Sequence, residues 1–245
     1  MIASKHIFAL FFCLACFIAQ AQWTTSTMEE FATEIIKIEN QIPEEASYSY
    51  KANYSFFEQE NSNDTVERMQ IELIYNAKNN ILNFSQLDKF IVQTDDIQIT
   101  CDTAYRTLIL NYPNPTYFSR KSGEDFKQIA EQKSTVKKRS MGDYQIFHLD
   151  FESTNLWKAA EIWFDKKGMV KKYILWTGQP ILDDSGSENK ILQPRMEVLY
   201  SDFHIGASAD KKQTVSVEHY FSDIKNKVLQ PKYSGFEVVD LREEK

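Results

Sequence analysis

The feature that most constrains the fold is a run of strand-length segments between residues 66 and 112, separated by short polar turns. The first segment alternates with period two, and its apolar positions are Met69, Ile71, Leu73 and Tyr75. Alternation of this kind is typical of a β-strand with one buried face and one solvated face. Several such strands in succession predict an antiparallel meander, a sheet with one apolar side.

The first 21 residues have the pattern of a cleaved export signal. A lysine precedes an apolar run at 7–18, which is shorter than the roughly 20 residues that span a bilayer. An Ala-Gln-Ala site follows at 19–21, so we expect cleavage before Gln22 and one mature domain over 22–245. The prediction is a periplasmic protein. Lipid attachment at Cys16 is the minor alternative, because the residue three before it is Cys13 and not a large aliphatic.

Charge and cysteine content narrow the class of protein. A net charge of −7 disfavours nucleic-acid partners, because phosphates need a basic surface. Cleavage of the leader leaves Cys101 as the one cysteine of the mature chain, so no intramolecular disulfide can form. Cys101 is in phase with Ile97 and Ile99, which predicts a small buried apolar residue and not a nucleophile.

A helix is predicted before the strands. The T-x-x-E segment at 27–30 is a capping box, which marks a helix start, and the proline at 43 ends the helix. Its apolar residues recur at steps of three and four and are Met28, Phe31, Ile35, Ile38 and Ile42. Such a stripe must be buried. Two interpretations stay open: a helix packed for stability, or a lid over the mouth of a cavity.

The rest of the chain adds strands and one further helix. A second helix start is expected at 122–125, and a basic segment at 133–139 is interpreted as a solvated turn. Further strands are expected at 48–57, 144–151, 161–165, 169–176, 196–203 and 214–221, with a hairpin turn at 166–168, a surface loop at 179–193 and a closing segment at 231–241. About ten strands are too many for a flat sheet. The predicted fold is mainly antiparallel β with covering helices, curled into an incomplete β-barrel.

No catalytic or metal-binding pattern is present. His148, His204 and His219 are far apart and lack ligand spacing, and His219 is interpreted as a core histidine. The acidic pairs at 95–96 and 183–184 lack the loop of alternating oxygen ligands that calcium needs. We therefore expect no enzyme, no metal and no cofactor.

The apolar side of the sheet is the remaining candidate for function. If its side chains interlock, it is a core; if the sheet is too wide for that, a cavity remains. A cavity of this kind favours an apolar guest, because each methylene moved out of water contributes about 0.8 kcal/mol.

The layout resembles the bacterial lipoprotein carrier family of the LolA type, with its LolB and LppX-like relatives. The leader, the amphipathic helix and the meander share that order, and three segments are similar to the family: DKFIVQTDD (88–96), NYPNP (111–115) and LQPKYSGFEVVD (229–240). One departure is NAKN (76–79), where the family often has an Arg-Pro pair whose arginine tethers the lid; Lys78 is a candidate substitute without the planar fork of arginine.

The resemblance implies an incomplete β-barrel with helices over its opening, and a monomeric periplasmic carrier of lipoprotein acyl chains or another lipid. Partners among the membrane proteins of the envelope would load or receive the ligand. The implied apolar lining is Tyr50, Tyr54, Phe56, Met69, Ile71, Leu73, Phe84, Phe90 and Val92. The alternative is a structural adaptor of a cell-envelope assembly, with a filled interior and no ligand.

Overall fold

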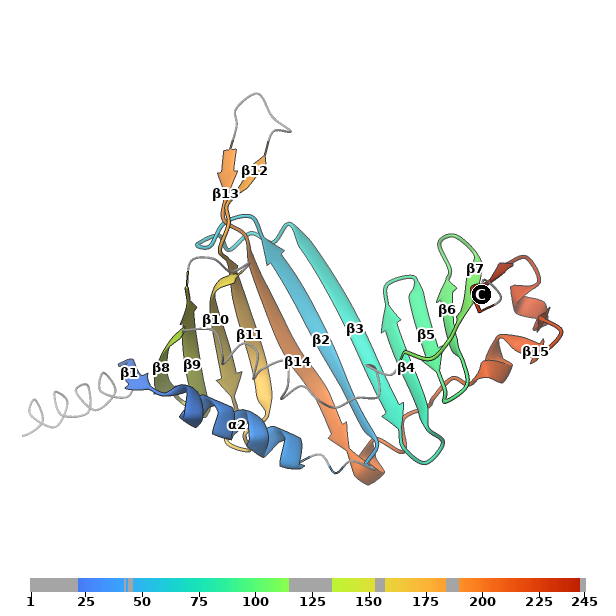
Figure 1. The fold of residues 1–245 in the computed structure, drawn as a ribbon, viewed down its shortest axis with the longest axis horizontal. Coiled ribbons are helices and arrows are strands. Elements are labelled where there is room, and N and C mark those ends of the chain that lie inside the picture. The colour runs from blue at the N-terminus through green and yellow to red at the C-terminus, as the bar shows by residue number, and fades with distance from the viewer. Residues whose placement is uncertain are drawn as a thin grey trace, which may run out of the picture. The chain divides into compact units, whose positions relative to one another are not determined.

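The computed structural model describes residues 22–41, 43, 46–114, 134–152, 157–183 and 190–242. Within these ranges the chain forms β-strands, one α-helix and three short 3-10 helices (Figure 1). In chain order they are β1 (Thr24–Ser26), α2 (Met28–Gln41), β2 (Tyr48–Phe57), β3 (Glu67–Asn76), β4 (Ile81–Gln86), β5 (Lys89–Gln93), β6 (Gln98–Asp102), β7 (Thr107–Asn111), β8 (Ser134–Met141), β9 (Tyr144–Phe151), β10 (Trp157–Phe164), β11 (Val170–Thr177), β12 (Ile181–Asp183), β13 (Lys190–Leu192), β14 (Arg195–Ile205), η1 (Gly206–Ser208), η2 (Val217–His219), β15 (Phe221–Asp223), β16 (Val228–Leu229), η3 (Pro231–Tyr233) and β17 (Glu237–Asp240). None of the described helices is long and apolar enough to cross a membrane.

Thirteen of the strands form one sheet, in the hydrogen-bonded order β1-β8-β9-β10-β11-β14-β2-β3-β4-β5-β6-β7-β17. The neighbours are antiparallel where their register is described, apart from β7 and β17, which run parallel. The sheet is open, because β1 and β17 end the order without pairing with each other. The predicted antiparallel β class is confirmed. The plural covering helices are not supported, since the described residues hold one α-helix and the expected start at 122–125 lies outside them.

The chain divides into two compact units, each built from segments that are distant in sequence. Unit 1 comprises 1–38, 55–67 and 123–199, and unit 2 comprises 39–54, 68–122 and 200–245. The expectation of one domain over 22–245 stays a prediction.

The core of unit 1 lies between α2 and strands β8 to β10 (Figure 1). Phe31 and Ile35 on α2 are 1% and 4% exposed, and they pack among Phe147, Leu149 and Ile162. The rings of Phe31 and Phe147 lie 5.5 Å apart. Steps of three and four along the helix put these side chains on one face, so burial of that face holds α2 on the sheet.

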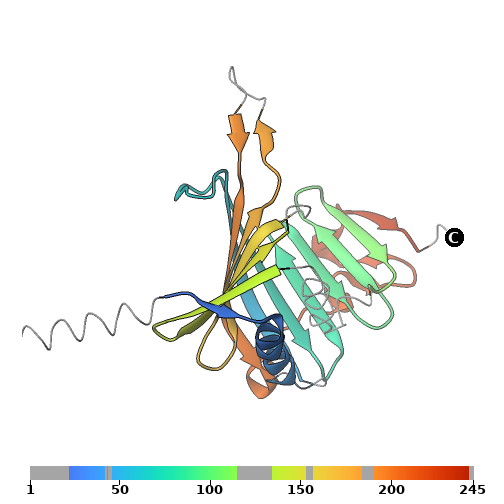
Figure 2. The same cartoon turned by 60° about the vertical axis from the view of Figure 1, so that its left-hand side comes forward.

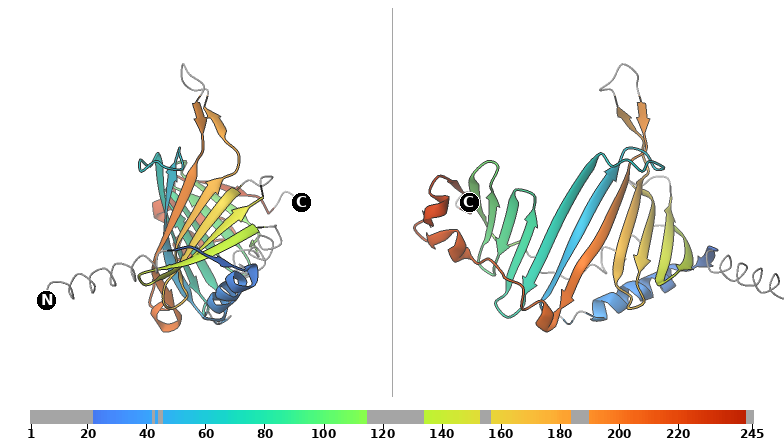
Figure 3. Two further views of the ribbon diagram at one scale, coloured as in Figure 1. Left: turned by 90° about the vertical axis from the view of Figure 1, so that its left-hand side faces the viewer. Right: turned by 180° about the vertical axis from the view of Figure 1, so that it is seen from behind.

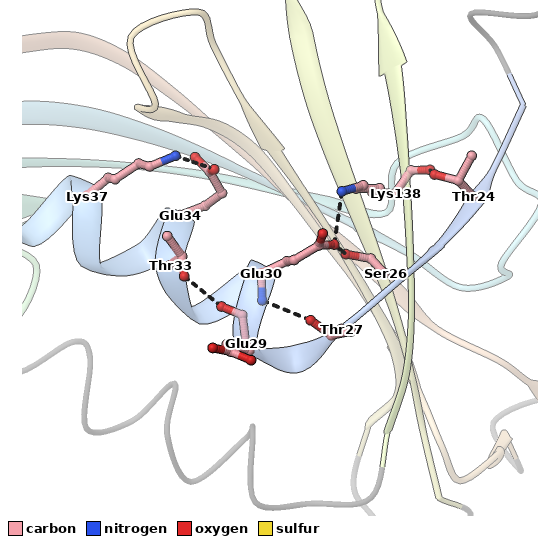
Figure 4. A network of polar contacts seen from close by, with 9 residues as sticks. All are labelled: Thr24, Ser26, Thr27, Glu29, Glu30, Thr33, Glu34, Lys37 and Lys138. Atoms are coloured by element: carbon pink, nitrogen blue, oxygen red, sulfur yellow. Dashed lines mark hydrogen bonds and ion pairs between the residues drawn. The ribbon is translucent and has the colours of Figure 1, made fainter.

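The start of α2 is fixed by the predicted capping box (Figure 4). The Glu30 backbone N–H donates to the Thr27 hydroxyl oxygen at 3.1 Å. The Glu30 carboxylate accepts from the Ser26 hydroxyl at 2.5 Å and pairs with the Lys138 ammonium of β8 at 2.9 Å. These contacts, the Ser26 hydrogen bond first, lower the pKa of Glu30. The helix start is thereby joined to the sheet through charge as well as through its apolar face.

Two segments of unit 1 differ from the sequence-based expectation. The turn expected at 133–139 is wrong for residues 134–139, which lie in β8, where Lys137 pairs with Asp150 of β9 at 3.0 Å. The loop expected at 179–193 contains the β12–β13 hairpin, which projects beyond the ends of β11 and β14 (Figure 3). The turn expected at 166–168 is confirmed, and Gly168 supplies its positive φ of 78°.

The core of unit 2 lies between the meander and the C-terminal segment, which covers one side of β5 to β7 (Figure 2). Ile99, Leu108 and Leu110 are fully buried there, against Tyr220 and Phe221 from the covering segment. We call this side of unit 2 the core face. It is filled by the protein's own side chains.

Cys101 and His219 test two residue-level expectations in this core. Cys101 is 1% exposed, which confirms the expected buried residue, and burial raises the pKa of its thiol to about 11. The expected strand at 214–221 is wrong, because 217–219 form the 3-10 helix η2. That turn places His219 at the surface with its ring against Tyr233, so it is not a core histidine.

Candidate functional site

The other side of unit 2 carries a row of aromatic and aliphatic side chains, which we call the tyrosine face. Residues paired across antiparallel strands share a face. The β3–β4 register pairs Leu73 with Phe84 and Tyr75 with Leu82, so these four side chains lie together. β2 adds its own residues to this face, because the rings of Tyr48 and Tyr75 lie 5.3 Å apart.

Tyr50 lies two residues along β2 from Tyr48, and its ring contacts two aromatic rings of β14. Its ring packs edge-on against Tyr200 at 5.8 Å and parallel to Phe203 at 6.2 Å. Tyr200 and Phe203 are three residues apart on β14 and still share a face, because Asp202 between them has a φ of 51° and interrupts the alternation.

Two phenol groups of this face, those of Tyr50 and Tyr54, hold their protons more tightly than usual. Burial, with the neighbouring Tyr48 and Tyr54 phenols, raises the pKa of Tyr50 to about 12, and burial also raises the pKa of Tyr54. A neutral phenol keeps its proton and can donate a hydrogen bond from the end of an apolar ring. The face therefore combines apolar area with hydroxyl donors.

Most of the apolar lining expected from the sequence comes together on this face. In unit 2 these residues are Tyr50, Tyr54, Met69, Ile71, Leu73 and Phe84. All are partly or fully buried, and Ile71 is 8% exposed. Phe56 belongs to unit 1 and is half-buried there.

Phe90 and Val92 do not lie on the tyrosine face, so their expected place beside Phe84 is wrong. The β4–β5 register pairs Phe84 with Ile91, whereas Phe90 pairs with Ser85. A hairpin with a two-residue turn pairs residues of opposite parity, so two even-numbered residues on its two strands point to opposite sides. Val92 is 2% exposed in the core face, and Phe90 is 39% exposed on the same side.

The expected lid residues divide into two groups. Phe31 and Ile35 are buried in the core of unit 1, and Met28 packs against that core, which favours a helix packed for stability in this part of α2. The environment of Ile38 is not described, and Ile42 lies outside the described residues, so the lid interpretation of these two stays a prediction.

Unit 2 also contains a hollow that the sequence did not predict, because its walls come from three distant segments. It has a volume of about 660 Å³. Its lining residues are Ala46, Ser47, Tyr75, Ala77, Lys78, Asn80, Gly206 and Asp210. We call it the Lys78 hollow.

Backbone and side-chain hydrogen bonds hold the walls of the Lys78 hollow together. The Ser47 hydroxyl donates to the Asp210 carboxylate and accepts from the Ala77 N–H at 3.0 Å. The Gly206 N–H donates to the Ser47 carbonyl oxygen at 2.8 Å. Ser47 thereby joins all three segments, and its own side chain is buried.

A second polar cluster lies in unit 1, on the side of the sheet away from α2. His148 Nε2 lies 3.0 Å from Asp150 Oδ1, and His148 Nδ1 lies 3.8 Å from Glu161 Oε2. Trp163 Nε1 donates to Glu161 at 2.6 Å, and the Arg139 guanidinium lies 3.8 Å from it. His148 lies on the opposite side of β9 from Phe147, which packs in the apolar core, and its partner Glu161 lies on another strand, which no local sequence pattern predicts. Within the described residues, no group of three or more His, Cys, Asp or Glu is arranged to hold a metal ion.

Comparison with solved structures finds similar but distant folds. A conserved uncharacterised protein from Thermus thermophilus is 11% identical, with a TM-score of 0.42 over 86% of this chain and 99% of that one. A LolA superfamily protein from Nitrosomonas europaea is 9% identical, with a TM-score of 0.29 over 82% and 97% of the two chains. A putative outer membrane lipoprotein-sorting protein domain from Vibrio parahaemolyticus is 9% identical, with a TM-score of 0.31 over 78% and 97%.

No protein-family model matches the sequence, and no curated protein matches it. One of these solved structures is named as a member of the superfamily that the sequence resembles. At this distance the likeness concerns the fold alone, and the function rests on the chemistry of this chain's own residues.

Proposed function

We propose that this protein is an exported, non-enzymatic, LolA-like carrier or binding protein of the periplasm, with the tyrosine face of unit 2 as its ligand surface. The ligand would be a lipoprotein acyl chain or another apolar molecule. The observation that carries the proposal is the contrast between the two sides of unit 2. The core face is filled by the C-terminal segment, whereas Tyr50, Leu73 and Phe84 on the tyrosine face keep part of their surface exposed, next to the buried Leu82 and Ile71.

The physical basis of the proposed binding is the apolar surface area that the ligand and the face remove from water. An acyl chain laid over these rings moves its methylenes out of water, at about 0.8 kcal/mol each, without any specific polar contact. Tyrosine suits such a surface because its ring is apolar and its hydroxyl tolerates contact with water. Ligand binding would therefore depend on the shape of the face and on its freedom from buried charge.

A structural adaptor of an envelope assembly is the second candidate. It is favoured by the burial of Phe31 and Ile35 in a filled core, which fits a helix that stabilises the fold and does not open. An adaptor would bind no apolar probe.

Displacement of a fluorescent fatty acid from the purified mature chain tests the proposal. Leu73→Glu should weaken binding more than about tenfold, because it places a carboxylate in the apolar surface. Gln70→Glu and Phe90→Glu should bind as the wild type, since Gln70 is exposed and Phe90 lies on the opposite side. Equal behaviour of the three charge variants would reject the assignment of faces.

A milder variant separates loss of binding from loss of folding. Phe84→Ala should weaken binding about three- to tenfold by removal of ring area while the circular dichroism spectrum stays that of the wild type. Native mass spectrometry of the wild type should show co-purified lipid. A wild-type chain that takes up no apolar probe would decide for the adaptor.

A further inference from the structure

The Lys78 hollow is continuous with the tyrosine face through Tyr75. The Tyr75 ring packs against Tyr48 at 5.3 Å, and the same side chain lines the hollow. Its hydroxyl donates to the Asn80 side-chain oxygen, another lining residue, at 3.0 Å. A chain lying over Tyr48 would therefore bring its polar end to the hollow.

The hollow carries one cationic and one anionic side chain. Lys78 is exposed, and no ion pair or hydrogen bond engages its ammonium group within the described part of the chain. Asp210 Oδ1 accepts from the Ser47 hydroxyl, while Oδ2 has no such contact within the same ranges. Asn80 adds a side-chain amide to the lining, and the nitrogen of this amide donates a hydrogen bond to the Asp95 carboxylate. A lining with one positive and one negative side chain is complementary to a head group that carries one negative and one positive charge.

We propose that the Lys78 hollow binds the zwitterionic head of a phospholipid-type amphiphile whose acyl chain lies over the tyrosine face. Lys78 would bind the phosphate and Asp210 the ammonium group. This assignment rests on the proposed function, and it adds a head-group preference that apolar area alone does not give. A volume of about 660 Å³ falls within the range of small-molecule sites.

Competition with three single-chain lipids of equal chain length tests the assignment. Lysophosphatidylethanolamine is zwitterionic, lysophosphatidylglycerol is anionic and monoacylglycerol is uncharged, and each is titrated against the fluorescent fatty acid bound to the mature chain. The wild type should bind the zwitterionic lipid about three- to tenfold more tightly than the other two lipids. This is the range expected for one charge-assisted hydrogen bond at a site that is partly exposed to water.

The two charged residues should act separately. Lys78→Gln should weaken both phosphate lipids about three- to tenfold and leave monoacylglycerol unchanged. Asp210→Asn keeps an acceptor for Ser47 and should weaken only the zwitterionic lipid. Lys225→Gln, at an exposed lysine of the same unit outside the hollow, should bind all three as the wild type does.

Each result decides the matter. Wild-type selectivity in both hollow variants, with the fatty acid still bound, would overturn the head-group assignment and leave the proposed function intact. Displacement by phosphoethanolamine alone, as strong as by the intact lipid, would overturn the lipid source in favour of a soluble zwitterion. A wild-type chain that binds no fatty acid would end the proposed function and this assignment together.

Discussion

His148 lies where charges from several strands meet. Glu161 first, and then Asp150, raise the pKa of its imidazole, against the opposing effect of burial. Burial alone would raise the pKa of Glu161, but His148, Trp163 and Arg139 lower it on balance. Lys137 and His148 also outweigh burial to lower the pKa of Asp150. A proton on His148 is therefore bound more tightly in the folded chain than in the unfolded one.

The sign of the pH dependence follows from these directions. The contribution of His148 is complete below the ordinary value of 6.5 and is lost as the pH rises through its folded pKa. His148→Gln should therefore lower the melting temperature more at pH 5.5 than at pH 8.5, as measured by circular dichroism. Equal losses at both pH values would show that the cluster does not hold a proton.

His219 provides a control of opposite sign. Burial and then Lys232 lower the pKa of this surface histidine, so its neutral form is favoured in the folded state. That contribution is present above the ordinary value of 6.5 and is lost as the pH falls through the folded pKa. His219→Gln should cost less stability at pH 5.5 than at pH 8.5.

At the scale of the element, α2 is held by its buried face and by its capped start. Phe31→Ala should lower the free energy of unfolding by about 3–5 kcal/mol, the usual loss for a large aromatic side chain in a filled core. Ile36→Ala is the matched control, because Ile36 is 48% exposed on the other side of the same helix, and it should change stability by less than about 0.5 kcal/mol. Chemical denaturation measures both. Equal losses would contradict the packing of α2 through Phe31.

The secondary-structure elements also show which features a local sequence pattern predicts and which it does not. The Thr27 cap, the period-two strand β3 and the Gly168 turn are local, and the sequence predicted each of them. The face of Phe90 depends on the length of the turn that precedes β5, and a one-residue error in that turn moves a whole strand to the other face. The 214–221 segment alternates like a strand, but residues 217–219 form η2. In this conformation Val215 and Val217 pack against the core face.

At the scale of the whole molecule, export is the expectation that frames the proposed function. We expect the protein produced in an envelope-bearing bacterial host to begin at Gln22 and to be released with the periplasmic fraction. Intact-mass measurement checks this. A mass that retains residues 1–21, or one that carries a lipid on Cys16, would contradict the predicted cleavage.

The sequence by itself determined the antiparallel β class, the capped helix, the burial of Cys101 and most of the residues on the tyrosine face. These follow from propensity and periodicity, which act between near neighbours in the chain. The tertiary structure alone decided the parallel pairing of β17 with β7, the partners of His148 on other strands and the walls of the Lys78 hollow. Each joins segments that are distant in the chain, and no local pattern encodes which distant backbone or charge a side chain will meet.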